Sequence, residues 1–227
     1  MSGKVLVLRP QPGGDRTAER ATALGLRPVV APLFRIRALP WQAPDRNAHD
    51  ALLLTSANAA RHAGGGLASL LDLPCYAVGE ATAAAAIEAG AQDVRIGPAD
   101  GEALLRLMEA DGVRSALHLC GREHRLPSRS SIAIASVPVY AAEAADRLPA
   151  EAEAAIEAGA IALLHSPRAA ALYASLVGAG RGRLSIAAIS EAAAASAGPG
   201  WAAVEVAAEP RDHALLEAAA KLCQRGN

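Results

Sequence analysis

An internal repeat, with a shift of about 111 residues between its copies, constrains the fold of this chain more than any other feature. The segment LLLTSANAA at 52–60 matches LLHSPRAAA at 163–171, and AVGEATAAA at 77–85 matches AISEAAAAS at 188–196. Alanine-rich sequence matches itself by chance, so the informative matches are the pairs that follow each apolar run: Thr-Ser with His-Ser, and Gly-Glu with Ser-Glu. A period this long excludes a solenoid and predicts two similar domains.

Short apolar runs alternate with alanine-rich stretches along the chain, and alanine is the best helix former. The clearest runs lie at 5–8, 28–32, 51–54, 161–164 and 186–189. Because strand, loop, helix, strand is the unit of a parallel sheet, we expect two similar α/β domains, each a parallel sheet in three layers. In the first unit, a turn is expected at 11–14 and a helix at 17–24.

The two domains are not expected to be consecutive halves of the chain. Apolar Phe34 and Ile36 alternate with Arg35 and Arg37, which is typical of a half-exposed strand. The segment VPVY occupies the equivalent place in the repeat. The sequence therefore predicts a two-stranded β connector formed by 35–42 and 137–142. It also predicts a continuous domain at 43–136 and a discontinuous first domain at 1–34 plus 143–227.

Composition excludes several classes of partner. The formal net charge is −1, so no overall positive field draws the chain to nucleic acid or to an anionic membrane. Three widely spaced cysteines without a CxxC pair argue against a disulfide framework and a zinc site. No signal-type segment is present, and no stretch approaches the roughly 20 apolar residues of a membrane span. We expect a cytoplasmic protein and, because no apolar stripe is left over, a monomer.

Polar residues and glycines follow the predicted strands where the helices begin. In open parallel sheets, ligands bind beyond the carboxyl ends of the strands, and the N–H groups of helix N-termini favour anions there. The predicted binding residues at these positions are Arg9, Thr55, Ser56, Asn58, Gly79, Thr82, Gly121, Arg122, Ser166, Arg168 and Ser190. The alternative is that the Ser, Thr and Asn side chains are ordinary helix caps, and a duplicated cap would repeat as well.

Two further residues carry reactive groups. Tyr140 lies in the second connector strand, where its phenol can donate a proton or a hydrogen bond to a leaving group; the alternative is hinge packing, as the counterpart of Phe34. Cys120 follows a buried strand, where a cysteine is more often inert packing than a nucleophile. The chain has no phosphate loop, GxGxxG turn, HExxH pair or GxSxG elbow, which argues against a nucleotide-dependent enzyme.

The order of these motifs resembles the uroporphyrinogen-III synthase family. The likeness spans 5–222 and rests on VLVLRP, LLLTSANA, YAVGEATA, LHLCGRE, VPVY and LLHSPRA, in that order. It implies two α/β domains joined by a two-stranded ladder, with the first domain discontinuous. It also implies an enzyme of haem biosynthesis whose substrate is hydroxymethylbilane, a linear tetrapyrrole polycarboxylate. The family removes the terminal hydroxyl as water, inverts the last pyrrole ring and closes the macrocycle, with no cofactor or metal.

The resemblance also implies roles for single residues. Tyr140 matches the family's tyrosine that assists departure of the hydroxyl, and Arg9 is expected to contact a carboxylate. The polar positions expected to line the substrate cleft are Ser56, Thr82 and Ser166.

The chain departs from the family pattern after Ser190. Ala192 and Ala193 stand where many members carry threonine, so hydroxyl contacts from that helix start are lost. This departure favours the alternative function, a non-catalytic two-lobed module that binds or senses a small anion.

Overall fold

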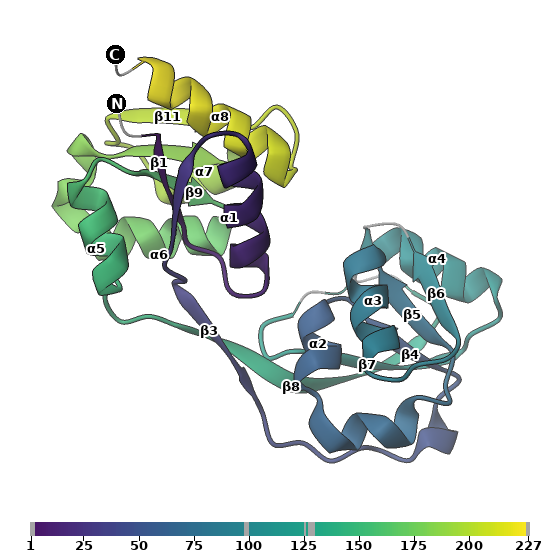
Figure 1. Ribbon diagram of the computed structural model, residues 1–227. Coiled ribbons are helices and arrows are strands. Elements are labelled where there is room, and N and C mark those ends of the chain that lie inside the picture. The colour runs from purple at the N-terminus through teal and green to yellow at the C-terminus, as the bar shows by residue number, and fades with distance from the viewer. Residues whose placement is uncertain (1–2, 98–99, 125, 127–129, 226–227) are drawn as a thin grey trace. The chain divides into compact units, whose positions relative to one another are not determined.

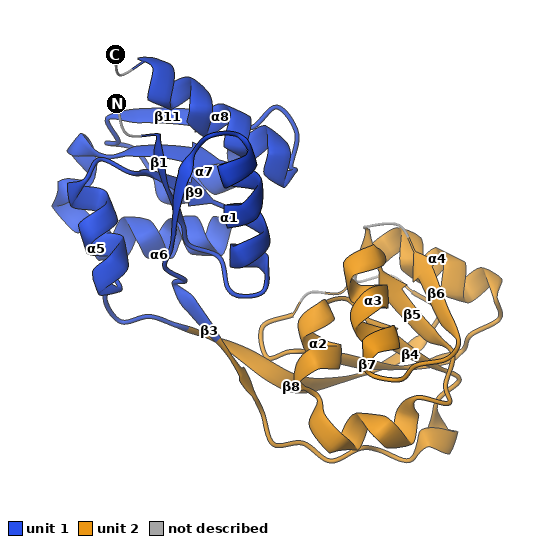
Figure 2. Cartoon of the chain, viewed as in Figure 1, with its two compact units in different colours: residues 1–35, 144–227 blue, residues 36–143 orange. Residues whose placement is uncertain are grey.

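The computed structural model describes residues 3–97, 100–124, 126 and 130–225. The chain forms two compact units, which Figure 2 colours separately. Unit 1 comprises residues 1–35 and 144–227, and unit 2 comprises residues 36–143. Each unit has its own sheet, so each is described by itself.

Unit 1 is built on a five-stranded parallel sheet with strand order β11-β10-β9-β1-β2 (Figure 1). Its strands are β1 (Lys4–Val7), β2 (Arg27–Val30), β9 (Ile161–Leu164), β10 (Ser185–Ala188) and β11 (Ala203–Val206). The central strands β1 and β9 are apolar along almost their whole length because helices cover both faces of the sheet.

The helices of unit 1 form a layer on each face of this sheet (Figure 1). They are α1 (Gly13–Ala23), α5 (Ala150–Glu157), α6 (Pro167–Val177), α7 (Glu191–Ala197) and α8 (Asp212–Arg225), with the short 3-10 segment η3 (Gly178–Arg183). One face is covered by α1 and α8, and leucines of α8 pack on Val5, Val7 and Leu163 in one buried cluster. The small alanines of α6 and α7 let these helices pack closely against each other.

Unit 2 is built on a six-stranded sheet with strand order β3-β8-β7-β4-β5-β6. Its strands are β3 (Phe34–Ala38), β4 (Ala51–Leu54), β5 (Cys75–Val78), β6 (Val94–Gly97), β7 (Ser115–Gly121) and β8 (Ala133–Ala144), and β3 starts in unit 1. The helical elements are α2 (Ala57–His62), α3 (Glu80–Glu88), α4 (Gly101–Ala110), η1 (Arg46–Ala48) and η2 (Gly64–Leu70). Alternate residues of β4 enter different cores, because Leu52 packs with the α2 side and Leu53 with α4.

The strand orders show that the sequence repeat is a structural repeat. Reading β6-β5-β4-β7-β8 against β11-β10-β9-β1-β2 matches five of the six strands of the unit 2 sheet with repeat partners in unit 1, and leaves out β3. The five matched strands of unit 2 pair in parallel with one another, as in unit 1. The predicted α/β class with two similar, mainly parallel sheets is therefore confirmed.

Two chain segments link the units, through β3 and β8. The Leu39 amide donates to the Val139 carbonyl, and the Ala145 amide donates to the Leu33 carbonyl, both at 2.9 Å. The residue number rises on one strand as it falls on the other, so the pairing is antiparallel. Strand β8 is longer than the predicted 137–142 segment because its first part also pairs in parallel with β7.

The first turn was predicted wrongly. Helix α1 begins at Gly13, four positions before the expected start, so part of the expected turn at 11–14 is helical. Gly13 and Gly14 are buried, and a Cβ on Gly14 would lie 3.0 Å from a methyl group of Val30. The glycine pair that suggested a turn instead lets the helix start close to the sheet.

None of the described helices is both long and apolar enough to cross a bilayer.

Candidate functional site: the strand-end rims

We call the residues that follow the carboxyl ends of the parallel strands the rim of each unit. The rim of unit 1 holds Arg9 after β1, Ser166 and Arg168 after β9, and Ser190 after β10. The rim of unit 2 holds Thr55, Ser56 and Asn58 after β4, Gly79 and Thr82 after β5, and Gly121 and Arg122 at the end of β7. Within each unit, parallel pairing brings the predicted residues to one edge of the sheet.

Three serines occupy the N-cap position of their helices. The Ser56 hydroxyl accepts a hydrogen bond from the Asn58 amide at 3.3 Å. The Ser166 and Ser190 hydroxyls accept from the amides three residues later, at 3.2 and 3.3 Å. The capping interpretation is therefore correct for all three. A capping hydroxyl accepts through its oxygen and keeps its own hydrogen for donation, so capping leaves each serine able to bind an anion.

Asp212 is the centre of a polar cluster at the rim of unit 1. Its carboxylate accepts from Thr17 Oγ1 at 2.9 Å, Arg20 Nη1 at 2.8 Å and His165 Nε2 at 2.9 Å. Arg9 Nη1 lies 3.6 Å from the same carboxylate. Burial alone would raise the pKa of Asp212, but the hydrogen bonds from His165, Arg20 and Thr17 outweigh burial and hold this pKa well below its usual value.

This cluster fixes the orientation of Arg9, one of the predicted binding residues. The guanidinium lies against Gly13, where an added Cβ would come within 2.6 Å of Nε. Burial lowers the pKa of Arg9, and the nearby Asp212 carboxylate opposes that shift. About a third of the Arg9 side chain remains exposed, so it can contact a ligand while it still interacts with Asp212.

Sequence reasoning missed Asp212 and the role of His165. His165 directly follows β9, and its Nδ1 lies 3.3 Å from the Leu163 carbonyl oxygen, while Nε2 faces Asp212. Both partners, the Leu163 carbonyl oxygen and the Asp212 carboxylate, are acceptors. One further repeat match was available in the sequence: GEALLRLME at 101–109 resembles DHALLEAAA at 212–220. That match puts a helix start at Asp212 after the last strand of unit 1, and was the signal that could have identified this residue.

Tyr140 lies in β8, beside the end of β7. In the β7–β8 pairing it is opposite Gly121, and the Arg122 amide donates to its carbonyl oxygen at 2.8 Å. A Cβ on Gly121 would lie 2.8–3.0 Å from the far end of the phenol ring. The missing side chain of Gly121 therefore makes room for Tyr140. The ring also lies 6.3 Å, centroid to centroid, from that of His62, and it is only partly buried.

Thr55 is held by a buried histidine. His118 on β7 is fully buried, and its Nε2 lies 2.9 Å from Thr55 Oγ1 while its Nδ1 lies 3.1 Å from Ser136 Oγ. Burial, followed by the proximity of His124, lowers the pKa of His118 to about 4. The ring is therefore neutral at pH 7 and can donate through one nitrogen and accept through the other.

The remaining predicted residues show mixed environments. Gly79 caps α3 with a φ of 71°, a conformation that glycine adopts without strain. Thr82, in the first turn of α3, is 5% exposed, whereas Asn58 is half-buried and Arg122 is exposed. Arg168 lies over the Phe34 ring, with 4.5 Å between the guanidinium carbon and the ring centroid. Within the described residues, one group combines three metal-binding side chains: His118, Cys120 and His124.

Comparisons with known proteins agree with this architecture. The solved uroporphyrinogen-III synthetase from Helicobacter pylori is similar, with a TM-score of 0.62 and 18% identity over 100% of both chains. A mutant uroporphyrinogen III synthase from the extremely thermophilic bacterium Thermus thermophilus gives a TM-score of 0.50 and 18% identity over 98% of this chain and 99% of its own. These two structures show a shared fold. None of the curated proteins matches the chain.

The match to a family model goes beyond the fold. The model described as "Uroporphyrinogen-III synthase HemD" matches residues 15–217, which is most of the chain and includes parts of both units. The chain therefore belongs to the uroporphyrinogen-III synthase family, the enzymes that convert hydroxymethylbilane to uroporphyrinogen III.

Proposed function

We propose that this chain performs the family reaction by binding the carboxylates of hydroxymethylbilane at the rims of both units. The observation that supports the proposal is the repetition of the rim. Helix starts follow β4 and β5 in unit 2 and β9 and β10 in unit 1, at matched positions of one sheet architecture, and three of these four starts have a serine cap. Backbone N–H groups and hydroxyls at such starts suit a substrate with many carboxylates.

The main task of the enzyme in this reaction is to position the two ends of the substrate. Loss of the terminal hydroxyl as water leaves an electrophilic azafulvene. A hindered pyrrole carbon must attack it, through a spiro intermediate, before the unassisted closure occurs. Holding a flexible chain so that one pair of atoms reacts first lowers the entropic part of the barrier. Arg9, held by Asp212, and the serine hydroxyls supply fixed donors for that purpose.

Tyr140 is the proposed acid for hydroxyl departure. Its phenol lies at the rim of unit 2, with its far end against Gly121. A partly buried phenol can donate its proton as the carbon–oxygen bond breaks, so that the hydroxyl leaves as water. The phenolate then recovers a proton when the closing ring loses one.

The chain is also proposed to act as a cytoplasmic monomer. All three cysteines are free, and two of them are buried, which fits a reducing compartment. The large apolar side chains exposed among the described residues are Leu24, just after α1, and Ile87, Ile96 and Val204, in α3, β6 and β11. Light scattering of the purified chain measures the oligomeric state directly.

The decisive experiment follows freshly made hydroxymethylbilane. We expect the type III isomer as the main product, whereas the type I isomer alone would remove the proposed activity. Tyr140→Phe is expected to slow turnover by about 100-fold or more, as for loss of a general acid. Tyr173→Phe is the matched control, because it removes a hydroxyl that has no hydrogen-bond partner in the described structure. Equal rates for Tyr140→Phe and wild type would leave Tyr140 as packing only.

The alternative, a binding module without turnover, rests on one feature of unit 1. Ala192 and Ala193 provide no hydroxyl in the first turn of α7, and Ala193 is fully buried. If the alternative holds, the protein binds uroporphyrinogen III or its linear precursor, and the product mixture equals that of the spontaneous reaction.

A further inference from the structure

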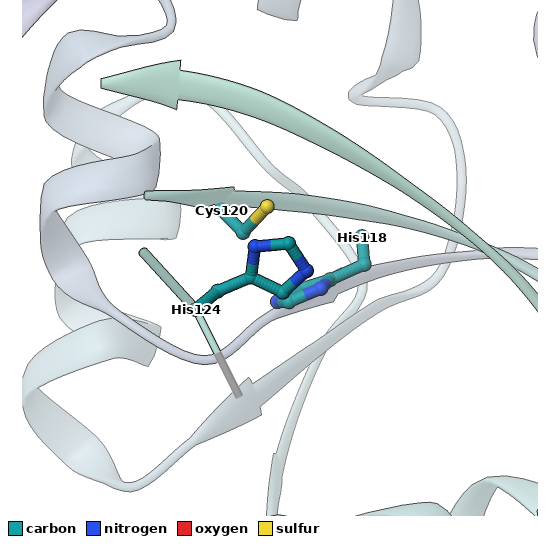
Figure 3. A group of neighbouring side chains, drawn as sticks. All are labelled: His118, Cys120 and His124. Atoms are coloured by element: carbon teal, nitrogen blue, oxygen red, sulfur yellow. The ribbon is translucent and has the colours of Figure 1, made fainter. Parts of the chain in front are cut away.

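Three side chains with metal-binding atoms meet at the end of β7. His118 and Cys120 are two positions apart on the strand, so they lie on the same face of the sheet. His124 comes back to them just after the strand ends (Figure 3). The imidazole nitrogens and the thiol sulfur of the three residues lie within 4.8 Å of one another. Small movements of the exposed His124 would bring them to the spacing of ligands around one ion.

The hydrogen bonding of His124 leaves one nitrogen available. Its Nδ1 lies 3.1 Å from the Gly121 carbonyl oxygen, which only accepts, so Nδ1 carries the hydrogen. The lone pair is then on Nε2. A donated Nδ1–H bond to a backbone carbonyl is the usual support of a metal-binding histidine, because it fixes both tautomer and ring orientation.

His118 offers the second imidazole. Its ring lies edge-on to that of His124, with 5.4 Å between the centroids and an interplanar angle of 75°. Its partners, Thr55 and Ser136, are hydroxyls that rotate to donate or accept. One ring nitrogen can therefore keep a hydroxyl partner while the other exchanges its hydroxyl for an ion. The plain alternative is a buried histidine that only joins strands through these two hydroxyls.

We propose that His118, Cys120 and His124 bind one borderline-soft divalent ion of the zinc class. Ions of this class bind imidazole and thiolate ligands, whereas magnesium and calcium prefer oxygen ligands. The Cys120 thiol releases its proton to solvent as the sulfur–metal bond forms. Three protein ligands leave the fourth position of a tetrahedral ion to water. Cys120 is 1% exposed, so the exposed His124 provides the way in from solvent.

This site is separate from the proposed reaction, which uses no metal. The two are nevertheless neighbours, because His118 holds Thr55 and because Cys120 precedes the glycine on which Tyr140 packs. The spacing His-x-Cys-x-x-x-His is not one of the common zinc patterns, which is why the sequence alone argued against a zinc site.

The test titrates the reduced, full-length protein with Zn²⁺ and with Co²⁺, and counts bound ions by equilibrium dialysis. We expect one ion per chain. Cobalt should produce visible absorption of a tetrahedral site together with a thiolate-to-metal charge-transfer band, which a site without sulfur cannot give. Zinc should also raise the melting temperature, because it binds the folded chain preferentially.

Variants separate this site from adventitious binding. Cys120→Ser and His124→Ala should each weaken binding by at least about 100-fold and remove the charge-transfer band. His124 is exposed, so His124→Ala should fold normally, which circular dichroism verifies. Cys223→Ser and His213→Ala are the controls and should bind like wild type. Failure of the wild type to bind one ion, or unchanged binding by His124→Ala, would overturn the proposal.

Discussion

The rims of unit 1 and unit 2 follow the same strand order but use different polar groups. In unit 1, the buried carboxylate of Asp212 collects Thr17, Arg20 and His165. In unit 2, a histidine that is neutral at pH 7, His118, joins two hydroxyls instead of a carboxylate. The repeated architecture therefore preserves the positions of helix starts without preserving the interactions that hold them.

The two clusters also differ in the sequence separation of the residues that they join. Unit 1 is assembled from two segments, and the Thr17–Asp212 hydrogen bond joins residues that are 195 positions apart. Unit 2 is continuous, and Thr55 and His118 are 63 positions apart. An ion-pair cluster between α1 and α8 ties the two segments of unit 1 together. We expect its removal to cost more than the loss of any single hydroxyl at the rim of unit 2.

The largest expected effect is that of Asp212→Asn. The substitution removes the charge that three donors and Arg9 share, and puts a neutral amide in its place at a position where the side chain is only 9% exposed. We expect unit 1 to lose about 3 kcal/mol of stability, as when a buried ion pair is broken. Hydrogen exchange of amides in β9 measures this loss separately from β4 of unit 2.

Asp93→Asn is the matched control for that experiment. Asp93 pairs with Arg95, but its side chain is 53% exposed, so we expect a loss of less than about 1 kcal/mol. Equal losses for the two variants would mean that the Asp212 cluster is not what holds unit 1 together.

The second effect concerns acid stability, which should differ between the units. The pKa of His118 is lowered from 6.5 to about 4 by burial and by His124. In the unfolded chain, His118 binds a proton below about pH 6.5, whereas in the folded chain it binds one only below about pH 4. The stability of unit 2 should therefore fall as the pH drops through this window, by about 3 kcal/mol in all.

Unit 1 should respond at lower pH. The pKa of Asp212 is lowered from 3.8, so its contribution is present above that value and is lost as the pH falls through the folded-state pKa. Hydrogen exchange in β4 and β9 between pH 4 and 7 tests the contrast. His118→Gln should flatten the response of β4, whereas the exposed His213→Gln should not. Identical pH profiles of exchange for β4 and β9 in the wild type would contradict the predicted difference between the units.

The third effect isolates the position of Tyr140. Gly121→Ala places a methyl group 2.8–3.0 Å from the far end of the phenol. A flexible side chain can move away, so stability should change little while turnover falls by about tenfold, as the acid is displaced. Gly65→Ala is the control, because nothing lies within 4 Å of the added carbon. If Gly121→Ala turns over at the wild-type rate, the position of Tyr140 is unimportant.

The smallest effect separates capping from substrate binding at Ser166. Ser166→Ala should destabilise α6 by about 1 kcal/mol, whereas Ser166→Gly should cost only a few tenths. Both variants lack the hydroxyl, so both should raise KM if that hydroxyl meets a substrate carboxylate. A KM that rises in neither variant would assign Ser166 to capping alone.

The sequence predicted the parts of the fold that local patterns determine. Apolar runs such as those of β4 and β9, followed by Ser-capped helices, identified the strands and the repeat. The start of α1 was missed, because burial of Gly13 and Gly14 depends on Val30 and Arg9. The Asp212 cluster was also missed, because it joins residues that are far apart in the sequence. Its members are recognisable only when the sheet brings α1, β9 and α8 together.

The central claim is that the rims of both units bind the tetrapyrrole, and the most direct test maps the bound product on the protein. Titration of isotope-labelled protein with uroporphyrinogen III, followed by amide chemical shifts, reports which helix starts it meets. The account predicts shifts at the starts of α6 and α7 in unit 1 and of α2 and α3 in unit 2, together with Gly121. Shifts confined to one unit, or clustered at the amino ends of the strands, would contradict it.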